Sequence, residues 1–459
     1  MRNESGTIAA ISTAMSNSGI GIVRMSGEEA VEIAERIYKG KNEKKLSKQP
    51  THTIHYGYIV DGEDTIDEAL VMLMRGPHSY TGEDTVEINC HGGVYVVRRI
   101  LETVIKYGAR PADPGEFTKR AFLNGKMDLS QAEAVGDLIS SKNEYALRSS
   151  VSQLKGNIKK EIQKIREEIL YHTAFIETAL DDPEHISVDG YGEKLEVVVE
   201  DHMKSLKHLL STCDDGRMIK EGIKTVIVGK PNAGKSSLLN LLIGENRAIV
   251  TDIAGTTRDI LEEYITLHGI SLKIIDTAGI RETKDIVEKI GVDRAREMAQ
   301  KADLILYVVD SSVPLDENDE EIMEMLTGKK AIILYNKTDL QPEIQPEILK
   351  EKTGHPVIPI SAKEEKGITE LEEQIKDMFF GGEISFNDEV YITNARHKAA
   401  LEEADRSLDL VRNSIERGMP EDFFSIDLMN AYENLGKILG ESVGEDLVNE
   451  IFSKFCMGK

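Results

Sequence analysis

The stretch Gly229-Lys230-Pro231-Asn232-Ala233-Gly234-Lys235-Ser236 decides the fold of the central part of this chain. It matches the pattern GxxxxGK[ST] and lies between an apolar run, residues 225–228, and a helical run, residues 237–242. The glycines let backbone N–H groups point at phosphate oxygens, Lys235 brings charge to the β and γ phosphates, and the Ser236 hydroxyl suits Mg²⁺. The pattern therefore predicts a phosphate-binding loop between a strand and a helix.

Three further motifs follow in the order expected of a guanine-nucleotide domain. Asp276-Thr277-Ala278-Gly279 closes the predicted strand 272–275, where Asp276 orients the Mg²⁺ shell and the Gly279 N–H meets the γ-phosphate. Asn336-Lys337-Thr338-Asp339 follows the predicted strand 331–334, and Ser361-Ala362-Lys363 follows the strand 357–360. A carboxylate accepts from both N1–H and the 2-amino group of guanine, whereas adenine offers neither donor. Asp339 therefore selects GTP over ATP, and the set predicts a GTPase.

The residue after Gly279 is Ile280, which cannot orient a water molecule as glutamine does in GTPases of the Ras type. The segment 255–259 suits a first switch, with Thr257 closing on Mg²⁺. The amide oxygen of Asn232 suits a monovalent cation beside the phosphates, and a loop-stabilising hydrogen bond explains the same residue equally well. Both interpretations of Asn232 stay open at this point.

The chain organises into four segments around this GTPase domain. Residues 1–118 alternate predicted strands (21–25, 53–60, 69–74 and 85–89) with amphipathic helices (28–38 and 94–107), which indicates an α/β domain. Residues 216–380 alternate apolar strands with helices, as in a parallel sheet covered on both faces. The flanking segments, 119–215 and 381–459, have helical periodicity. The expected architecture is a multidomain chain in which the inserted α/β domain interrupts a helical bundle.

Three apolar stripes support the helical segments. Apolar residues recur at steps of three and four from Leu147 to Ile169, which predicts one long helix. A second helical face is shared by Leu401, Leu408, Val411 and Ile415, and a third by Leu447, Ile451 and Phe455. Lys155, Lys159, Lys160, Lys164 and Arg166 form a candidate basic strip on the first helix, although a solvated face is the simpler interpretation.

Composition narrows the class of protein. The 459 residues suit about three domains, and the net charge of −25 disfavours general coating of nucleic acid or membrane. Cys90, Cys213 and Cys456 form neither a disulfide framework nor a zinc pattern, which fits a reducing cytoplasm. Neither a signal peptide nor an apolar run of about 20 residues is present in the sequence, so a cytoplasmic protein is expected.

Three features of the sequence point to a known family: the order of segments, the motif Asp276-Thr277-Ala278-Gly279-Ile280-Arg281-Glu282 and the terminal Phe455-Cys456-Met457-Gly458-Lys459. Together they resemble the MnmE (TrmE) family of tRNA-modification GTPases over the whole chain. The resemblance implies a K⁺-activated GTPase that, with an FAD-dependent MnmG-type partner, adds aminomethyl or carboxymethylaminomethyl groups to carbon 5 of wobble uridine 34. It also implies a homodimer through the N-terminal domain, a heterotetramer with that partner, and binding of 5-formyl- or methylene-tetrahydrofolate.

Site residues follow from the motifs and this resemblance together. The resemblance implies folate contacts from Arg24, Glu87, Lys126 and Lys459; from sequence alone the first three suit ordinary surface charges. It implies a K⁺ site of Asn232, Thr251, Ile253 and Thr256, and Glu288 as the residue that orients water. Cys456, three residues from the end, is off the apolar stripe and is expected in the modification step.

The residues expected at GTP or at catalysis are Asn232, Ala233, Gly234, Lys235, Ser236, Ser237, Thr251, Asp252, Ile253, Ala254, Gly255, Thr256, Thr257, Asp276, Thr277, Ala278, Gly279, Glu288, Asn336, Lys337, Asp339, Ser361, Ala362, Lys363 and Cys456, with Ser236 and Thr257 at Mg²⁺. The alternative is a regulatory GTPase that acts as a ribosome or RNA assembly factor without chemistry on tRNA. The N-terminal α/β domain and the cysteine-bearing terminus favour the first interpretation.

Overall fold

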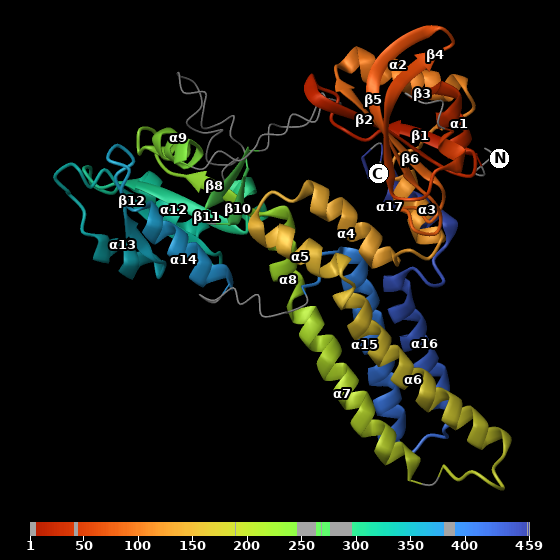
Figure 1. Ribbon diagram of the computed structural model, residues 1–459. Helices are drawn as coiled ribbons and strands as arrows, with labels where there is room; N and C mark the ends of the chain where they lie inside the picture. Colours follow the sequence, from red (N-terminus) through yellow and green to blue (C-terminus); the bar gives the residue numbers. More distant parts are fainter. Residues whose placement is uncertain are drawn as a thin grey trace. The chain divides into compact units, whose positions relative to one another are not determined.

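The computed structural model describes residues 6–40, 45–188, 190–245, 263–267, 269–275, 296–380, 391–456 and 458. They form two compact units: unit 1 comprises Met1–Gly136, Gln153–Ser187 and Pro420–Lys459, and unit 2 comprises Asp137–Ser152 and Val188–Met419. Each unit is described by itself. The elements form two sheets, each packed with helices, and a set of long helices, as the sequence predicts (Figure 1). The boundaries expected at residues 118 and 215 fall inside helices α3 (Glu116–Leu123) and α8 (Cys213–Glu221).

Unit 1 opens with a seven-stranded sheet in the order β3-β4-β5-β6-β2-β1-β7. Its strands are β1 (Ile8–Ile11), β2 (Ser18–Ser26), β3 (Tyr38–Gly40), β4 (Thr53–Asp61), β5 (Asp64–Met74), β6 (Thr85–Gly92) and β7 (Arg110–Pro111). Helices α1 (Ala30–Ile37) and α2 (Val94–Lys106) bury their apolar stripes against this sheet in one core. The four longest strands and both helices confirm the sequence prediction; β1, β3 and β7 were missed because two to four residues give no readable period.

The long helix predicted from Leu147 to Ile169 is wrong as a single element. The chain forms α5 (Glu144–Leu154) and α6 (Asn157–Asp181), separated at Gly156, whose φ of 81° lies in the left-handed region. That backbone conformation suits glycine and ends a helix, although the apolar spacing continues across it. The helical stripe in the sequence therefore could not report the break.

Helix α6 packs against α16 (Asp422–Leu439) within unit 1. Arg166, on the buried side of α6, donates to both carboxylate oxygens of Glu441 at 2.8 and 2.6 Å and lies over the Tyr432 ring. It is buried, so its place in the candidate basic strip was wrong. Lys155, Lys160 and Lys164 are exposed, which fits the solvated-face interpretation.

The apolar stripe predicted at the C-terminus is shifted by one residue. In α17 (Glu445–Ser453), Val448 and Phe452 are buried against Leu129 and Ala132, whereas Leu447 is 38% exposed. Helix α4 (Leu129–Ser140) supplies both of those contacts. Ile451 and Phe455 lie at the margin of this cluster. The end of the chain is thus anchored through Phe452, and Cys456 follows it as an exposed residue.

Unit 2 contains a six-stranded sheet in the order β13-β12-β11-β8-β10-β9. Its strands are β8 (Ile223–Val228), β9 (Glu263–Leu267), β10 (Ile270–Ile274), β11 (Leu304–Asp310), β12 (Ala331–Asn336) and β13 (Val357–Pro359), all parallel except β9. Alternate residues enter two cores: α9 (Lys235–Glu245) and α14 (Ile368–Phe380) contribute to one, and α12 (Glu317–Met325) and α13 (Pro346–Thr353) to the other. The predicted parallel sheet with both faces covered is confirmed, and the antiparallel edge strand β9 was missed.

In unit 2, α7 (Tyr191–Ser211) packs against α15 (Ala395–Glu416), where Leu401, Leu408 and Val411 are buried as predicted. The segment between α4 and α5 contacts the sheet and the helix that leads into it. Asn143 Nδ2 donates to the Ile219 carbonyl at 3.2 Å and to Ser271 Oγ at 2.9 Å. These bonds join residues 137–152 to α8 and β10.

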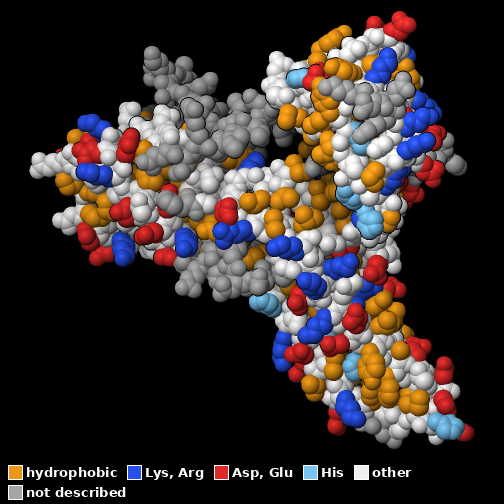
Figure 2. Space-filling model, in the orientation of Figure 1, with side chains coloured by type: hydrophobic (Ala, Val, Ile, Leu, Met, Phe, Trp, Pro, Cys, Tyr) orange, Lys and Arg blue, Asp and Glu red, His pale blue; other side chains and the backbone are white. Residues whose placement is uncertain are grey.

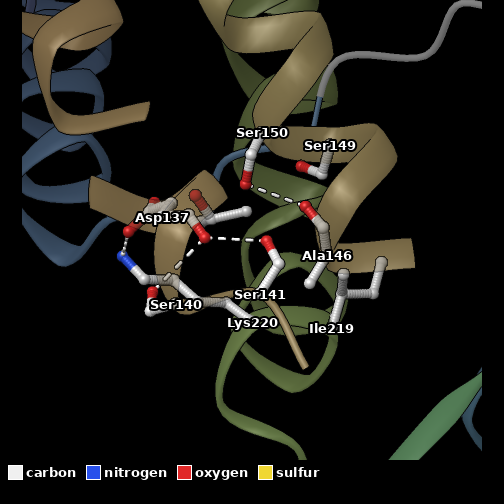
Figure 3. A pocket seen from close by; sticks show the side chains of 9 residues that line it. Asp137, Ser140, Ser141, Ala146, Ser149, Ser150, Ile219 and Lys220 are labelled. Carbon is white, nitrogen blue, oxygen red and sulfur yellow. Dashed lines mark hydrogen bonds and ion pairs between the residues drawn. The ribbon is translucent and has the colours of Figure 1, made fainter. Parts of the chain in front are cut away.

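A small polar depression lies beside that junction (Figure 3). Its wall includes serines of the segment 140–150 and the ion pair between Lys220 Nζ and Asp137 Oδ1, 2.8 Å apart. Ser141 donates to the Asp137 carbonyl in the last turn of α4, and Ser150 donates to the Ala146 carbonyl within α5, so both hydroxyls bond to nearby backbone. None of the predicted GTP or folate residues lines it, and it is therefore not the candidate site.

Candidate functional site

The phosphate-binding loop lies between β8 and α9, as the motif predicts. Gly229 (φ 150°) and Gly234 (φ 103°) both have backbone conformations that L side chains rarely adopt. A Cβ on Gly229 would strike the Val308 carbonyl, and one on Gly234 would strike Asn336 Nδ2. Both positions therefore need glycine for backbone conformation and for close approach.

Lys235 points back into its own loop. Its Nζ donates to the carbonyls of Gly229 and Lys230, each at 2.7 Å. Burial lowers the pKa of Lys235, which marks an ammonium group partly withdrawn from water. Such a group gains strongly from a phosphate that restores its interactions.

Asn336 holds the three nucleotide motifs together. Its Nδ2 donates to the Ala233 carbonyl at 2.8 Å, and its Oδ1 accepts from the Ala362 N–H at 3.2 Å. Asn336 is 2% exposed at the end of β12, so one buried side chain joins the phosphate loop, the 336–339 motif and the 361–363 motif. The sequence predicts the three motifs, and the structure brings them to one edge of the sheet.

Asp339, which the sequence predicts to bind guanine, contacts two residues of the 361–363 motif. Ser361 Oγ donates to its Oδ1 at 2.9 Å, and Lys363 Nζ lies 3.9 Å from its Oδ2. The Asp339 side chain is 10% exposed, whereas that of Lys363 is 82% exposed. The carboxylate is thus fixed from one side by a hydroxyl while its lysine neighbour stays in solvent.

Lys337 adopts φ 65° and reaches Asp310, whose Oδ2 lies 2.5 Å from its Nζ. Burial alone would raise the pKa of Asp310, but hydrogen bonds from Lys337 and Ser312 outweigh burial and lower that pKa. Asp310 was not among the predicted site residues, and its position at the end of a buried strand next to β12 is the signal that points to it.

Part of the predicted GTPase site lies outside the described residues. The predicted residues outside are Thr251, Asp252, Ile253, Ala254, Gly255, Thr256, Thr257, Asp276, Thr277, Ala278, Gly279 and Glu288. Asn232 is described: it is exposed and has φ 63°, a left-handed conformation that asparagine tolerates. Ser236 and Ser237 begin α9 and are exposed, on the side where the phosphate loop turns into the helix.

A second cluster lies in unit 1, on the N-terminal sheet. Arg24 on β2 and Glu87 on β6 are cross-strand neighbours, and Glu87 Oε1 accepts from Arg24 Nε at 2.8 Å and lies 2.7 Å from Nη2. The side chains are only 15% and 14% exposed, so the interpretation of both as ordinary surface charges is wrong. The Arg24 guanidinium also lies 5.8 and 5.7 Å from the ring centres of Tyr80 and Phe117.

The C-terminal segment meets this pair. The Gly458 carbonyl accepts from Ser12 Oγ at 3.1 Å and from Arg24 Nη1 at 3.3 Å. Gly458 has φ 84°, and a Cβ there would strike the Ile11 carbonyl, so this contact requires glycine. Cys456 is exposed between Phe455 and the anchored Gly458, while Met457 and Lys459 lie outside the described residues.

Lys126 takes a separate position. Its Nζ donates to the Pro77 carbonyl at 2.9 Å, and its stem passes the Gly82 position. The structure thus brings Arg24, Glu87 and the C-terminal segment into direct contact, whereas Lys126 contacts the loop between β5 and β6. Ser12, Tyr80 and Phe117 were missed by the sequence analysis because they lie after β1, in the loop between β5 and β6, and on α3, and only the tertiary structure brings them to Arg24 or Gly458.

Comparisons with known proteins show which family the chain belongs to. A model of the "MnmE helical domain" matches residues 129–456, and a model of the "GTP-binding protein TrmE N-terminus" matches residues 7–126. The chain is 58% identical to a tRNA modification GTPase MnmE of Lachnoclostridium phytofermentans, with 99% of each chain covered. It is 49% identical to that of Geobacillus thermodenitrificans and 46% identical to that of Bacillus subtilis, with 99% of this chain and 100% of each relative covered.

Among solved structures, the G domain of the Thermotoga maritima FeoB iron transporter matches 34% of this chain at 27% identity, with a TM-score of 0.26. The family assignment does not use this likeness. It rests on the two domain models and on relatives that cover nearly the full length of the chain. The chain therefore belongs to the MnmE (TrmE) family of tRNA modification GTPases.

Proposed function

We propose that this chain hydrolyses GTP and acts in the modification of tRNA. Membership of the MnmE family supports both parts of the proposal. The observation that carries the GTPase part is Asn336, which joins the phosphate loop, the base-recognition motif and the third motif through two hydrogen bonds. In this role Lys235 binds phosphate, Ser236 and Thr257 hold Mg²⁺, and Asp339 binds guanine.

The finer chemistry is the addition of an aminomethyl or carboxymethylaminomethyl group to carbon 5 of wobble uridine 34, together with an FAD-dependent MnmG-type partner. The one-carbon unit comes from 5-formyl- or methylene-tetrahydrofolate. Glu87 suits such a ligand, because the N–H groups of a pterin can donate to a carboxylate, and Arg24 holds that carboxylate in place through their ion pair. Lys126 and Lys459 complete the proposed folate contacts.

Cys456 is proposed to take part in the modification step. The contact of Gly458 with Arg24 supports this, because it holds the residue two positions earlier close to the Arg24–Glu87 pair. Cys456 is exposed, so its thiol is accessible to a substrate. Hydrolysis of GTP does not involve it.

K⁺ is proposed to supply the charge that an arginine finger supplies in other GTPases, in a chain where Ile280 stands in place of a water-orienting glutamine. Asn232, Thr251, Ile253 and Thr256 would hold the cation, and Glu288 would orient the attacking water. The position of Asn232 supports this proposal. Its backbone is left-handed and its side chain is exposed on the phosphate loop, where a cation can reach it. A cation beside the developing charge lowers the barrier, as an arginine finger does by ~10³–10⁵ in rate.

The proposed organisation is a folate-binding and dimerisation domain (1–118), a helical domain in two parts (119–215 and 381–459) and an inserted GTPase domain (216–380). A homodimer through the first domain and a heterotetramer with the partner complete the assembly, in the cytoplasm. Within the part of the chain that the structure describes, every helix is too short or too polar to be a membrane span. Figure 2 shows Lys and Arg side chains interspersed with Asp and Glu over the visible face of the described residues, which suits local rather than general contact with tRNA.

Nucleoside mass spectrometry of tRNA from cells that lack this protein tests the proposed function. The expected result is loss of the 5-substituent at the wobble uridine, restored by the intact chain and not by Cys456→Ser. The Cys456→Ser protein should hydrolyse GTP at the normal rate. Unchanged wobble uridines in the deleted cells would instead favour an assembly-factor role.

The rate of GTP hydrolysis in matched K⁺ and Na⁺ buffers tests the cation. We expect K⁺ to accelerate turnover, Asn232→Ala to remove the difference, and Glu288→Ala to slow turnover while leaving GTP affinity nearly intact. Equal rates in the two buffers would contradict the proposed K⁺ site. Loss of affinity in proportion to rate would make Glu288 a structural residue.

A further inference from the structure

Lys230, the second residue of the phosphate loop, has its ammonium group between two carboxylates at the start of α12, those of the N-cap Asp316 and of Asp319. Its Nζ lies 2.6 Å from Asp319 Oδ2 and 2.9 Å from Asp316 Oδ2. The Lys230 side chain is 14% exposed and that of Asp319 is 2% exposed, whereas that of Asp316 is 52% exposed. Burial alone would lower the pKa of Lys230, but the two carboxylates outweigh burial and raise it, so this lysine is charged.

Asp319 is itself fixed from two elements. The buried Tyr307 of β11 donates its hydroxyl to Asp319 Oδ1 at 2.7 Å. The Asp316 N–H donates to Asp319 Oδ2 at 3.0 Å, and Asp316 Oδ1 accepts from the Asp319 N–H at 3.2 Å, which completes the capping box at the start of α12. The position of the Asp319 carboxylate is therefore determined by the central sheet and by a capped helix.

The backbone of Lys230 in turn holds the phosphate-binding lysine. Lys235 Nζ donates to two carbonyls, those of Gly229 and Lys230, and these two bonds hold the ammonium group in place. Gly229 cannot shift towards β11, because it already lies against the Val308 carbonyl. The chain of contacts runs from Tyr307 to Asp319, to the Lys230 side chain, to the Lys230 carbonyl and to Lys235.

We propose that the buried Lys230–Asp319 ion pair is a positioning device that sets the Lys230 carbonyl, and through it the Lys235 ammonium group, for the β-phosphate of a guanine nucleotide. This inference rests on the proposed binding of GTP and names two residues outside the nucleotide contacts assigned above. A buried ion pair contributes geometry more reliably than stability, because desolvation offsets much of its attraction. Asp316 has the lesser role, since its side chain is half exposed and its attraction is screened by water.

The test compares the affinities of the full chain for GDP and for guanosine. Lys230→Met and Asp319→Asn each remove one charge and retain most of the shape of the side chain. We expect each variant to bind GDP about tenfold more weakly. This is smaller than the loss of about 100-fold that a group misplaced by about 1 Å can cause. Affinity for guanosine should stay within about twofold, less than ~0.5 kcal/mol, because Asp339 and Ser361 are not part of the chain of contacts. The double variant should lose no more than either single variant.

Glu320→Gln is the matched control. Glu320 lies next to Asp319 on α12 and pairs with Lys352 at 3.2 Å, at a site where both side chains are exposed. It should leave both affinities unchanged. Lys230→Arg, which keeps the charge, should recover most of the affinity for GDP. Equal losses for GDP and guanosine, or GDP affinity unchanged in folded Lys230→Met, would overturn the proposal; absence of GDP binding by the unaltered chain would instead refute the proposed function.

Discussion

Individual residues in the nucleotide site have separable duties. Both polar atoms of the Asn336 amide form hydrogen bonds within the protein, to Ala233 and Ala362. One oxygen of Asp339 accepts from Ser361, and the carboxylate has the acceptors that the two donors of guanine require. The first residue joins the three motifs, and the second is the residue proposed to select the base.

Asp339→Asn should exchange the specificity of the base site. An asparagine amide accepts from N1–H but repels the 2-amino group of guanine, whereas its N–H₂ suits the 2-oxo group of xanthine. We expect affinity for GTP to fall by at least about 100-fold, ~2.7 kcal/mol, and affinity for xanthosine triphosphate to rise. Titration calorimetry measures both. Asp377→Asn, on the exposed side of α14, is the control and should bind GTP normally.

Glu116 is a buried charge with a structural duty in the N-terminal domain. Its two carboxylate oxygens accept from Arg110 at 2.9 and 2.5 Å, and one of them also accepts from Arg120 at 3.1 Å. Burial alone would raise the pKa of Glu116, but the hydrogen bonds from Arg110 and the Asp113 N–H, with the charge of Arg120, lower it. The carboxylate is thus more stable in the folded state than in the unfolded chain.

Glu116→Gln should destabilise the protein at neutral pH by about 3 kcal/mol, as expected when one partner of a buried pair is removed. Because the folded-state pKa is depressed, this contribution is complete above the unfolded value of about 4.3 and disappears as pH falls through the folded value. Urea unfolding at pH 7 and pH 3 measures the difference. Glu32→Gln, in an exposed pair with Arg36 on α1, should change stability little at either pH.

At the scale of elements, helices α3 and α17 meet through a glycine. Gly115, at the N-cap of α3, has φ 69°, and a Cβ there would lie 2.6 Å from the Phe452 carbonyl and 2.9 Å from Phe455 Cβ. Helix α17 carries the C-terminal segment to Arg24. The approach of α17 to α3 therefore governs where Cys456 lies.

Gly115→Ala should unfold more readily and lose the modification of tRNA while retaining hydrolysis of GTP. The left-handed backbone alone costs about 1–2 kcal/mol for alanine, and the overlap with Phe452 adds about 1–3 kcal/mol. Gly125→Ala separates the two effects, since Gly125 has φ 68° and open space around its Cβ position. If thermal unfolding showed equal destabilisation of the two variants, α17 would be able to move away from the Gly115 position with no loss of stability.

At the scale of the whole molecule, the described residues proposed to bind the nucleotide lie in one part of unit 2. The described hydrogen bonds of the phosphate loop and of the base-recognition motifs join residues 229–362 to one another. A bond from Asn143 Nδ2 to Ser271 Oγ joins this region to another part of unit 2. Binding of nucleotide should therefore be separable from the attachment of the domain.

A fragment of residues 216–380 should bind GDP within about threefold of the full chain, less than ~1 kcal/mol. It should melt at a lower temperature, because it lacks Asn143 and the packing of Tyr145 against the core of the sheet. Fluorescence of a labelled GDP measures affinity, with the Asp339→Asn fragment as the negative control. A fragment that folds but does not bind GDP would contradict the proposed boundaries at 216 and 380.

The sequence alone determined the GTPase motifs, the parallel sheet and the core face of α15, because each depends on local spacing that a short window contains. It did not determine the break at Gly156, the shifted face of α17 or the duties of Arg166, Asp310 and Asp319. A glycine conformation, a helix rotated by one residue and a buried ion pair depend on what packs against them from distant parts of the chain. Arg24 and Glu87 looked like two surface charges 63 positions apart, and only the register of β2 with β6 made them partners.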